Sequence, residues 1–340
     1  MTSRYAEAGV DIEAAQEATR LIAEAVAATH GPEVLAGVGA FGGLYAANRL
    51  RQMEAPVLVA STDGVGTKTL VAARLGRWDT IGQDLVNHCV NDILVQGARP
   101  LFFLDYVASA RLVPSQVADI VRGIADACRA VGCALLGGEM AEMPGVYREG
   151  AWDVVGTIVG VAERAELITG ERIAPGDVVL AFPSSGLHTN GYSLARRALD
   201  AEDWALPRPE LGGQSIGDAL LAVHRCYLPH VQRLQEVDID IKGLAHITGG
   251  GIFDNLPRVL PANVDVLVRR GTWPEPPIFA LIQQLGQVDE KEMFRVFNMG
   301  LGMVAIVPRE HAERALKTLP GECYVVGEVV PGERKVRLIS

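Results

Sequence analysis

The segment from Ile81 to Gly97 contains no Lys, Arg or Glu, although its apolar residues predict a helix from about Thr80 to Gln96. The exposed face of a helix normally carries such charged residues, so this helix is expected to be buried on most of its sides. Burial of that kind requires neighbouring elements, and the rest of the chain supplies alternating strands and helices. The sequence therefore predicts an α+β or α/β layout.

The polar residues of this helix include a stripe of ionisable groups. Asp84, His88 and Asp92 are spaced i, i+4 and i+8, so they share one face. Buried carboxylates are costly without partners, so they must be met by a metal ion or by cations. A hydrogen-bonded network in the core, with no role in ligand binding, is the alternative interpretation.

A short polar segment, Ser61–Thr69, follows the apolar strand predicted at Pro56–Ala60. Its glycines allow backbone N–H groups to approach an anion, and Lys68 adds a point charge. The spacing differs from a Walker A loop, because Thr67 separates Gly66 from the lysine. A plain turn with a solvated Asp and Lys is the other interpretation of this segment.

Further glycines and acids gather at the ends of predicted elements. Gly37–Gly43 contains Phe41 and is either a linker or a mobile flap that covers phosphates. Asp105 lies in the apolar strand Leu101–Val107. A strand near Cys133–Leu136 runs into Gly137–Gly145, which carries Glu139.

The second half of the chain repeats this pattern. Ser184–Ser193 leads into a helix and contains His188, Thr189 and Asn190, while Ala245–Ile252 carries His246 and the run Thr248–Gly251. Small and hydroxyl-bearing residues that open a helix can bind an anion. A histidine in such a loop can also be purely structural. Between these two loops we predict one helix over about residues 217–235.

Length and composition limit the possible classes of protein. The 340 residues suffice for two domains, and the charged, Pro- and Gly-containing stretch 164–176 predicts a boundary that gives domains 1–165 and 166–340. A net charge of −10 without any basic run argues against nucleic acid as a partner. No apolar run approaches the roughly 20 residues of a membrane span, and the N-terminus has no signal-peptide core, so we expect a cytoplasmic protein without a membrane partner. The five cysteines lack a C-x-x-C pair and are expected to be free thiols.

Six ordered motifs together resemble one family, the AIR synthase family of phosphoribosylformylglycinamidine cyclo-ligases. The motifs are Asp63-Gly-Val-Gly-Thr-Lys68, Cys89-Val-Asn-Asp-Ile-Leu-Val-Gln-Gly97, Gly137-Gly-Glu-Met-Ala-Glu-Met-Pro144, Gly186-Leu-His-Thr-Asn-Gly-Tyr192, Thr248-Gly-Gly-Gly251 and Phe297-Asn-Met-Gly300. The chain departs from the family pattern at Met140, where Thr is usual, at Thr189, where Ser is common, and at Arg99, where an acid is common.

The resemblance implies a homodimer with an α+β fold of two domains. The N-terminal sheet domain would form the dimer and the site for ATP and metal, and the C-terminal α/β domain would lie on the substrate side. It also implies a reaction in purine biosynthesis, in which ATP drives ring closure of formylglycinamidine ribonucleotide to aminoimidazole ribonucleotide, with release of ADP and phosphate. The implied cofactors are ATP and Mg²⁺.

The resemblance and the chemistry of the side chains together suggest roles for particular residues. Asp63 and Asp92 suit Mg²⁺, and Asp63, Lys68, Asp92 and His188 are the candidate catalytic residues. The candidate ATP-binding residues are Gly39, Phe41, Gly42, Gly43, Gly64, Gly66, Thr67, Lys68, Asp105 and Glu139. The candidate substrate-binding residues are His188, Thr189, Asn190, His246, Thr248, Gly249, Gly250 and Gly251.

Two other functions are compatible with parts of this pattern. One is a small-molecule kinase of the same superfamily, similar to thiamine phosphate kinase. The segment around His188 and the pair Met143-Pro144 of this chain do not resemble that kinase. The other is a non-catalytic nucleotide-binding subunit, which would be expected to lose the metal acids that this chain keeps at positions 63 and 92. The related selenide enzyme uses a reactive Cys or selenocysteine in its N-terminal segment, and the hydrogenase-maturation protein acts through a C-terminal cysteine. Residues 1–60 of this chain contain no Cys, and the given sequence ends in Arg337-Leu338-Ile339-Ser340, so neither function is expected.

Overall fold

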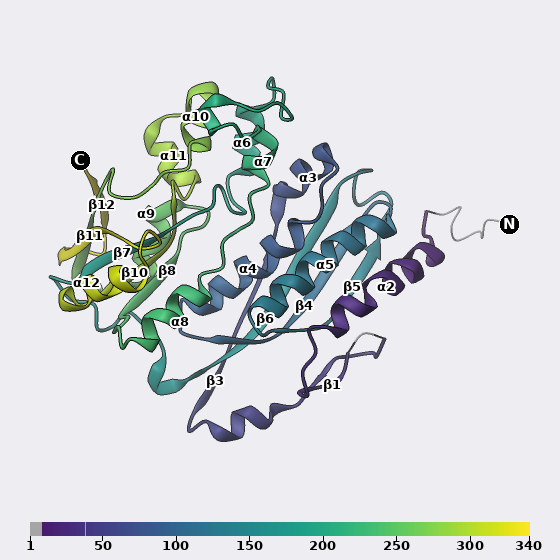
Figure 1. The fold of residues 1–340 in the computed structure, drawn as a ribbon, viewed down its shortest axis with the longest axis horizontal. Helices are drawn as coiled ribbons and strands as arrows, with labels where there is room; N and C mark the ends of the chain where they lie inside the picture. The colour runs from purple at the N-terminus through teal and green to yellow at the C-terminus, as the bar shows by residue number, and fades with distance from the viewer. Residues whose placement is uncertain (1–8, 38) are drawn as a thin grey trace. The chain divides into compact units, whose positions relative to one another are not determined.

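The computed structural model describes residues 9–37 and 39–340 (Figure 1). The chain forms two compact units. The N-terminal unit runs up to Ile93 and includes Ala98–Ala165, and the C-terminal unit consists of Leu94–Gly97 and Glu166–Ser340. Both units combine helices with a mixed sheet, which confirms the expected α+β class.

The N-terminal unit is built on a sheet with the strand order β3-β6-β4-β5. Strand β6 pairs antiparallel with β3 and with β4, and β4 pairs parallel with β5. The strands are β3 (Pro56–Gly64), β4 (Arg99–Ser109), β5 (Ala134–Glu142) and β6 (Trp152–Glu163).

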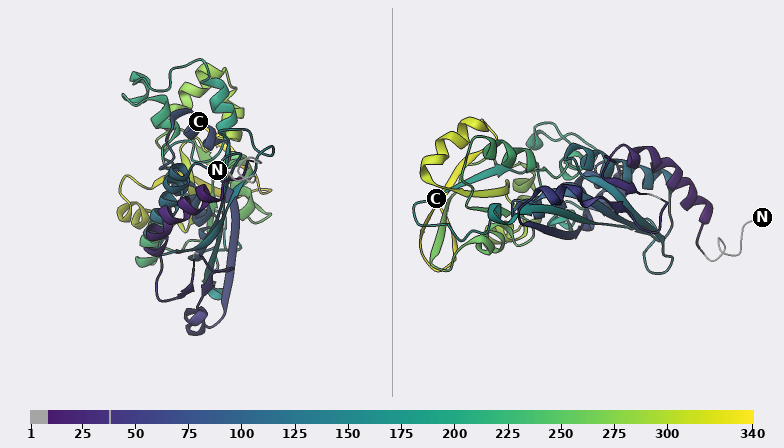
Figure 2. Two further views of the ribbon diagram at one scale, coloured as in Figure 1. Left: turned by 90° about the vertical axis from the view of Figure 1, so that its right-hand side faces the viewer. Right: turned by 90° about the horizontal axis from the view of Figure 1, so that it is seen from below.

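Helices cover one face of this sheet (Figures 1 and 2). They are α4 (Ile81–Leu94) and α5 (Pro114–Ala130), with α2 (Ile12–Ala27) packed against α5. Helices α4 and α5 approach so closely that a Cβ atom on Gly82 would lie 2.0 Å from the Ile120 carbonyl oxygen. Only glycine fits there, so this contact fixes how α4 lies in its unit.

The opposite face of the sheet is more exposed. Burial alternates residue by residue along β6, so that Val155, Val159 and Val161 are half-exposed on this second face. Leu58 on β3 is 59% exposed and Leu104 on β4 is 37% exposed. The apolar side chains of this face therefore meet solvent in the isolated chain.

The segments around the sheet are short. Strands β1 (Val34–Ala36) and β2 (Leu44–Tyr45) form a small hairpin, and the 3-10 helix η1 (Ala47–Gln52) follows it. The 3-10 helix η2 (Gly66–Lys68) leads from β3 into α3 (Thr69–Leu75).

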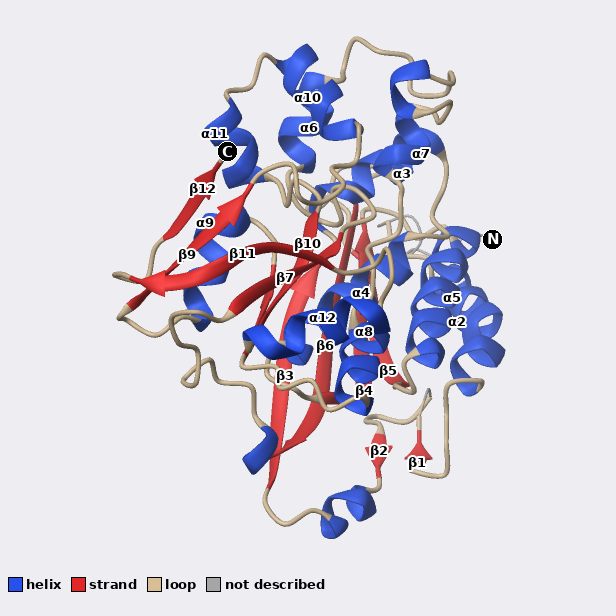
Figure 3. Ribbon diagram, turned by 60° about the vertical axis from the view of Figure 1, so that its left-hand side comes forward, coloured by secondary structure: helices blue, strands red, loops and turns tan. Residues whose placement is uncertain are grey.

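The C-terminal unit has a larger sheet with the order β12-β9-β11-β7-β10-β8 (Figure 3). Its neighbouring strands pair antiparallel except β12, which pairs parallel with β9. The strands are β7 (Val178–Pro183), β8 (Gly243–His246), β9 (Val264–Arg269), β10 (Leu301–Val307), β11 (Tyr324–Pro331) and β12 (Val336–Ile339). The helices are α6 (Tyr192–Ala198), α7 (Ile216–Leu220), α8 (Leu228–Glu236), α9 (Gly251–Asn255), α10 (Ile278–Gly286), α11 (Glu290–Val296) and α12 (Arg309–Thr318).

The structure corrects two expectations about these elements. The single helix expected over residues 217–235 is two short helices, α7 and α8, separated by the non-helical residues 221–227. Strand β5 continues through Glu142, so the Gly137–Glu139 segment lies within a strand and not in a loop after it. In the second case the pairing of β5 with β4 overrides the low strand propensity of two glycines.

Candidate functional site

Two of the predicted metal-binding carboxylates meet at one histidine in the N-terminal unit. A carboxylate oxygen of Asp63, at the end of β3, lies 2.8 Å from His88 Nε2, and a carboxylate oxygen of Asp92 lies 3.6 Å from the same nitrogen. Ser61 also donates a hydrogen bond to Asp92 at 3.1 Å. The expected stripe on α4 thus exists, and it faces the end of strand β3.

This histidine is strongly influenced by its acidic neighbours. Burial alone would lower the pKa of His88, but the hydrogen bond to Asp63 and the charges of Asp92, Asp63 and Asp84 outweigh it and raise the pKa. Asp63 remains half-exposed, whereas the His88 side chain is almost completely buried. The site therefore presents carboxylate oxygens outward and holds a proton-binding group behind them.

Lys68 does not occupy the solvated position that one of the two interpretations of its segment predicted. Its side chain and that of Asp84 are both 0% exposed, and Lys68 Nζ lies 2.8 Å from Asp84 Oδ2. Burial lowers the pKa of Lys68 more than the attraction of Asp84 raises it. The interpretation of Lys68 as a solvated turn residue is wrong, because the turn folds back and places the ammonium against α4.

The remaining predicted ATP residues lie at several places in the N-terminal unit. Gly66 has a positive φ of 63° and is exposed, as is Thr67. Two residues before Gly66, the N–H of Gly64 donates to the Asp63 carboxylate at 2.6 Å. The Gly39–Gly43 segment connects the strands of the β1–β2 hairpin, with Phe41 fully exposed, while Val38 lies outside the described residues.

Asp105 and Glu139 lie on the neighbouring strands β4 and β5. Burial raises the pKa of Asp105 to about 7. A Cβ atom on Gly138, which faces Asp105 across the strand pair, would lie 2.2 Å from its carboxylate oxygen, so a glycine is needed there. Glu139 is exposed.

The loop that carries His188 in the C-terminal unit is held by an asparagine of the Phe297–Gly300 motif. The Asn298 side chain accepts a hydrogen bond from the Ser184 hydroxyl at 2.9 Å and donates one to the Gly186 carbonyl at 2.9 Å. His188 itself has a positive φ of 62°, which is rare outside glycine. The loop is therefore fixed at both its start and its middle.

The Thr248–Gly251 turn is held in a similar way. Asn255 donates from its side-chain nitrogen toward the carbonyls of Thr248, Gly249 and Gly251, the last at 2.8 Å. A Cβ atom on Gly249 would lie 3.2 Å from the Asn190 side-chain oxygen, so the turn lies next to the His188 loop. The helix that this turn opens is only five residues long, and α6 only seven, so the helix dipoles expected at these anion sites are small.

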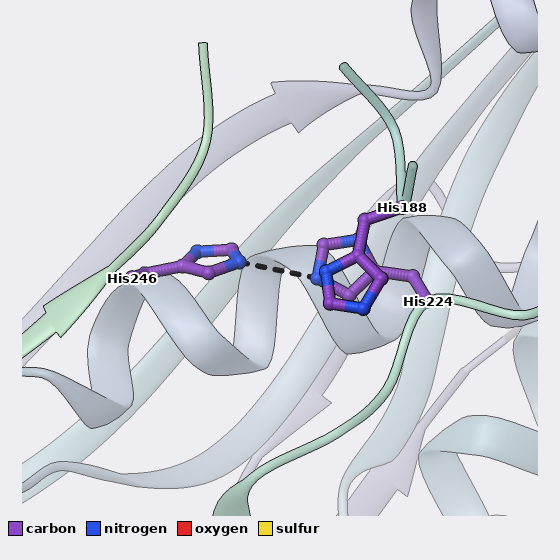
Figure 4. A group of neighbouring side chains, drawn as sticks. All are labelled: His188, His224 and His246. Atoms are coloured by element: carbon purple, nitrogen blue, oxygen red, sulfur yellow. Dashed lines mark hydrogen bonds between the residues drawn. The ribbon is translucent and has the colours of Figure 1, made fainter. Parts of the chain in front are cut away.

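Three histidines come together between these segments (Figure 4). His224 Nε2 lies 3.1 Å from His246 Nε2, and the rings of His224 and His188 stack with centroids 4.0 Å apart. Thr189 Oγ1 lies 3.3 Å from His224 Nδ1. The structure therefore brings three of the predicted substrate residues together around a histidine that the sequence analysis did not select.

Sequence reasoning missed His88, Asp84 and His224 as members of these clusters. The first two were recognised on the polar stripe of α4, but no role was assigned to them. His224 was placed inside a helix, although the nearby Pro229 disfavours helical backbone before it and could have indicated the break.

The chain matches two parts of one known family. Residues 46–162 match the AIR synthase related protein, N-terminal domain, and residues 174–339 match the AIR synthase related protein, C-terminal domain. Together with the two-unit fold, these matches show that the chain belongs to the AIR synthase related family.

Relatives within the family carry the name phosphoribosylformylglycinamidine cyclo-ligase. The protein of that name from Desulfitobacterium hafniense (strain DSM 10664 / DCB-2) is 50% identical over 96% of this chain and 96% of its own length. The one from Geobacillus kaustophilus is 49% identical over 98% of this chain and 97% of its own length. The recognition made from six motifs is confirmed over nearly the whole chain.

Solved structures with low sequence identity share the fold. Escherichia coli HypE has a TM-score of 0.67 at 19% identity, covering 96% of this chain and 93% of its own. Thiamine-monophosphate kinase from Stenotrophomonas maltophilia has a TM-score of 0.66 at 16% identity, covering 94% of this chain and 95% of its own. Within the described part of the chain, none of the helices is long and apolar enough to cross a membrane.

Proposed function

We propose that this chain is an ATP-dependent cyclo-ligase that closes the imidazole ring of aminoimidazole ribonucleotide in purine biosynthesis. The observation that carries the proposal is the 50% identity to phosphoribosylformylglycinamidine cyclo-ligase over 96% of both chains. The amide oxygen of formylglycinamidine ribonucleotide is a poor leaving group until ATP phosphorylates it. A neighbouring nitrogen then attacks the activated carbon, and phosphate leaves as the ring closes.

The N-terminal unit would bind ATP and Mg²⁺. Asp63 and Asp92 fit a hard divalent ion, because their oxygens converge on one point, next to His88. A bound Mg²⁺ would supply the charge neutralisation that phosphoryl transfer requires. Gly64, Gly66 and Thr67 lie directly after Asp63 and would contact the phosphates. A structural neighbour of this fold, a hydrogenase maturation protein HypE, has been solved in complex with ATP.

Other predicted ATP residues would have less direct roles. The exposed Phe41 on the Gly39–Gly43 loop would cover the nucleotide, and Asp105 and Glu139 would lie nearby on β4 and β5. Lys68 would act through its ion pair with Asp84, which holds the start of α3 against α4 and so positions the loop before it. Its direct contact with phosphate would require that pair to open.

The C-terminal unit would bind the ribonucleotide. His188, Thr189 and Asn190 form one wall of the proposed site, and the Thr248–Gly251 turn lies next to Asn190. The backbone N–H groups of this glycine turn would bind the ribose phosphate. His246 at the end of β8 would complete the site, and His188 would hold or move a proton during ring closure.

A homodimer would bury the exposed face of the N-terminal sheet. Leu58, Leu104 and the half-exposed valines of β6 lie on one largely apolar face, together with Thr62 and Thr157, because β3, β6 and β4 are neighbours in the sheet. Such a face is typical of a protein interface. We place the enzyme in the cytoplasm, where purine ribonucleotides are made.

The proposal is tested by measuring ADP formation by the purified chain with and without formylglycinamidine ribonucleotide. We expect ADP to form only with this substrate and in equal amount to aminoimidazole ribonucleotide. ADP formation with thiamine phosphate instead would favour the kinase alternative. Nucleotide binding without turnover on either compound would favour the non-catalytic subunit.

A further inference from the structure

The three clustered histidines of the C-terminal unit come from three separate segments. His188 lies in the loop between β7 and α6, His224 in the segment between α7 and α8, and His246 at the end of β8 (Figure 4). All three side chains are buried. Asn298 holds the His188 loop, the Val223 carbonyl next to His224 accepts a hydrogen bond from Ser185, and His246 ends strand β8, so each of the three segments has a fixed neighbour.

The spacing of their nitrogens matches that of ligands around one metal ion. The Nε2 atoms of His224 and His246 are 3.1 Å apart, and one ring nitrogen from each of the three histidines lies within 4.8 Å of the others. Two imidazole nitrogens at about 2.0–2.1 Å from a tetrahedral zinc ion would be separated by roughly 3.3 Å. Two of the three ligands therefore already stand at the required separation.

We propose that His188, His224 and His246 form a binding site for one transition-metal ion of the zinc type. Neutral imidazole suits Zn²⁺, Co²⁺, Ni²⁺ and Cu²⁺, whereas Mg²⁺ prefers oxygen ligands. Three histidines leave a fourth position open for water or for an atom of a ligand. The site is chemically distinct from the carboxylates of the N-terminal unit.

Metal binding would change which nitrogens of His224 and His246 carry their protons. Without metal, the contact between His224 Nε2 and His246 Nε2 is an N–H···N hydrogen bond, since one proton lies between two nitrogens. With metal, both rings carry their proton on Nδ1 instead, and His224 then donates to Thr189 Oγ1 at 3.3 Å. This change shifts tautomers and releases no proton from the neutral rings.

His188 must turn out of its stack on His224 to become the third ligand, because the in-plane lone pairs of two stacked rings do not converge on one ion. Its Nε2 accepts a hydrogen bond from the Ser185 backbone N–H at 3.2 Å, so ligation through Nε2 would also displace this donor. His224 and His246 are therefore the better-placed ligands, and His188 completes the site once its ring has rotated. The proposal concerns affinity for a metal ion and does not rest on the proposed function.

Cobalt is a suitable probe because tetrahedral Co²⁺ absorbs strongly in the visible range. Metal-free, full-length protein is titrated with Co²⁺ in a large excess of Mg²⁺, which occupies the oxygen-rich carboxylates. We expect one Co²⁺ per chain with the spectrum of tetrahedral nitrogen ligation. Loss of a residue that only hydrogen-bonds to a metal ligand costs about 10- to 100-fold in affinity. His224→Ala removes a ligand itself, so it should weaken Co²⁺ binding by at least about 100-fold.

A matched control removes an imidazole elsewhere in the same unit. His311 on α12 accepts a hydrogen bond from the Asp240 backbone and lies outside the cluster, so His311→Ala should bind Co²⁺ like the parent. His246→Gln keeps a polar side chain of similar size and should lose binding without unfolding, as its thermal transition will show. The proposal is overturned if the parent gives no tetrahedral spectrum, if folded His224→Ala and His246→Gln bind normally, or if His88→Ala abolishes binding.

Discussion

Replacing Lys68 by Met should destabilise the N-terminal unit severely, because it leaves the Asp84 carboxylate buried without this cation. Both side chains are completely buried, and the ammonium lies 2.8 Å from the carboxylate oxygen. Removing one member of a buried ion pair costs about 3–5 kcal/mol. For a unit of this size, each kcal/mol lowers the melting temperature by roughly 2–4 °C, so Lys68→Met should lower it by roughly 6–20 °C.

The assay is differential scanning calorimetry of the full chain, with hydrogen exchange of α4 reporting on the N-terminal unit. The double variant Lys68→Met, Asp84→Leu should recover most of the loss, because replacing both members of a buried pair by apolar residues is often neutral. The same change in the exposed pair Lys317–Glu313, at 74% and 79% exposure, should cost at most about 1 kcal/mol. A single variant Lys68→Met as stable as the parent would refute this reasoning.

Three other predictions concern activity, pH and assembly. Asp63→Asn and Asp92→Asn should each reduce turnover by several orders of magnitude, and the double variant should be little worse, since both would break the single proposed metal site; multiplicative losses in steady-state kinetics would contradict this. Burial raises the pKa of Asp105 to about 7. The folded state therefore keeps a proton on this carboxyl that the unfolded chain loses above about pH 4. The free energy of unfolding should thus fall as the pH rises from about 4 to 7. Asp105→Asn should remove this slope, so its melting temperature should gain on the parent between pH 5 and pH 8; a constant difference would argue against the shift. Leu58→Arg should convert a dimer to a monomer in sedimentation experiments while the fold survives, and an unchanged mass would exclude this face as the interface.

Local sequence determines some elements of this fold almost completely. Helix α5 spans Pro114–Ala130, where proline suits the first turn and the apolar residues repeat at helical spacing. The Asp11 side chain caps α2 by accepting hydrogen bonds from the backbone N–H groups of Glu13 and Ala14. In both cases the signals lie within the element itself.

Other features depend on contacts between distant segments and could not be predicted in this way. The sequence shows Lys68 in a polar turn, and only the packing of that turn against α4 shows that the ammonium is buried. His224 lies 22 residues from His246, and their contact depends on the break between α7 and α8. The stripe on α4 was predicted, but whether its acids meet cations or a metal was left open. The structure supplies Lys68 for Asp84 and His88 for Asp92.

The segment Leu94–Gly97 limits how the N-terminal and C-terminal halves of this chain can be combined with halves of a related protein. It lies within the first half of the sequence but belongs to the C-terminal unit, where the Gln96 carbonyl accepts a hydrogen bond from the Ile168 N–H at 3.2 Å. A Cβ atom on Gly97 would lie 3.2 Å from the Glu166 carbonyl oxygen. Recombination between two related genes at residue 165 would therefore combine Leu94–Gly97 of one parent with the C-terminal unit of the other. Hybrids joined at that point should be most stable when the two parents have the same residues at Leu94–Gly97 and at the positions it contacts, Glu166 and Ile168.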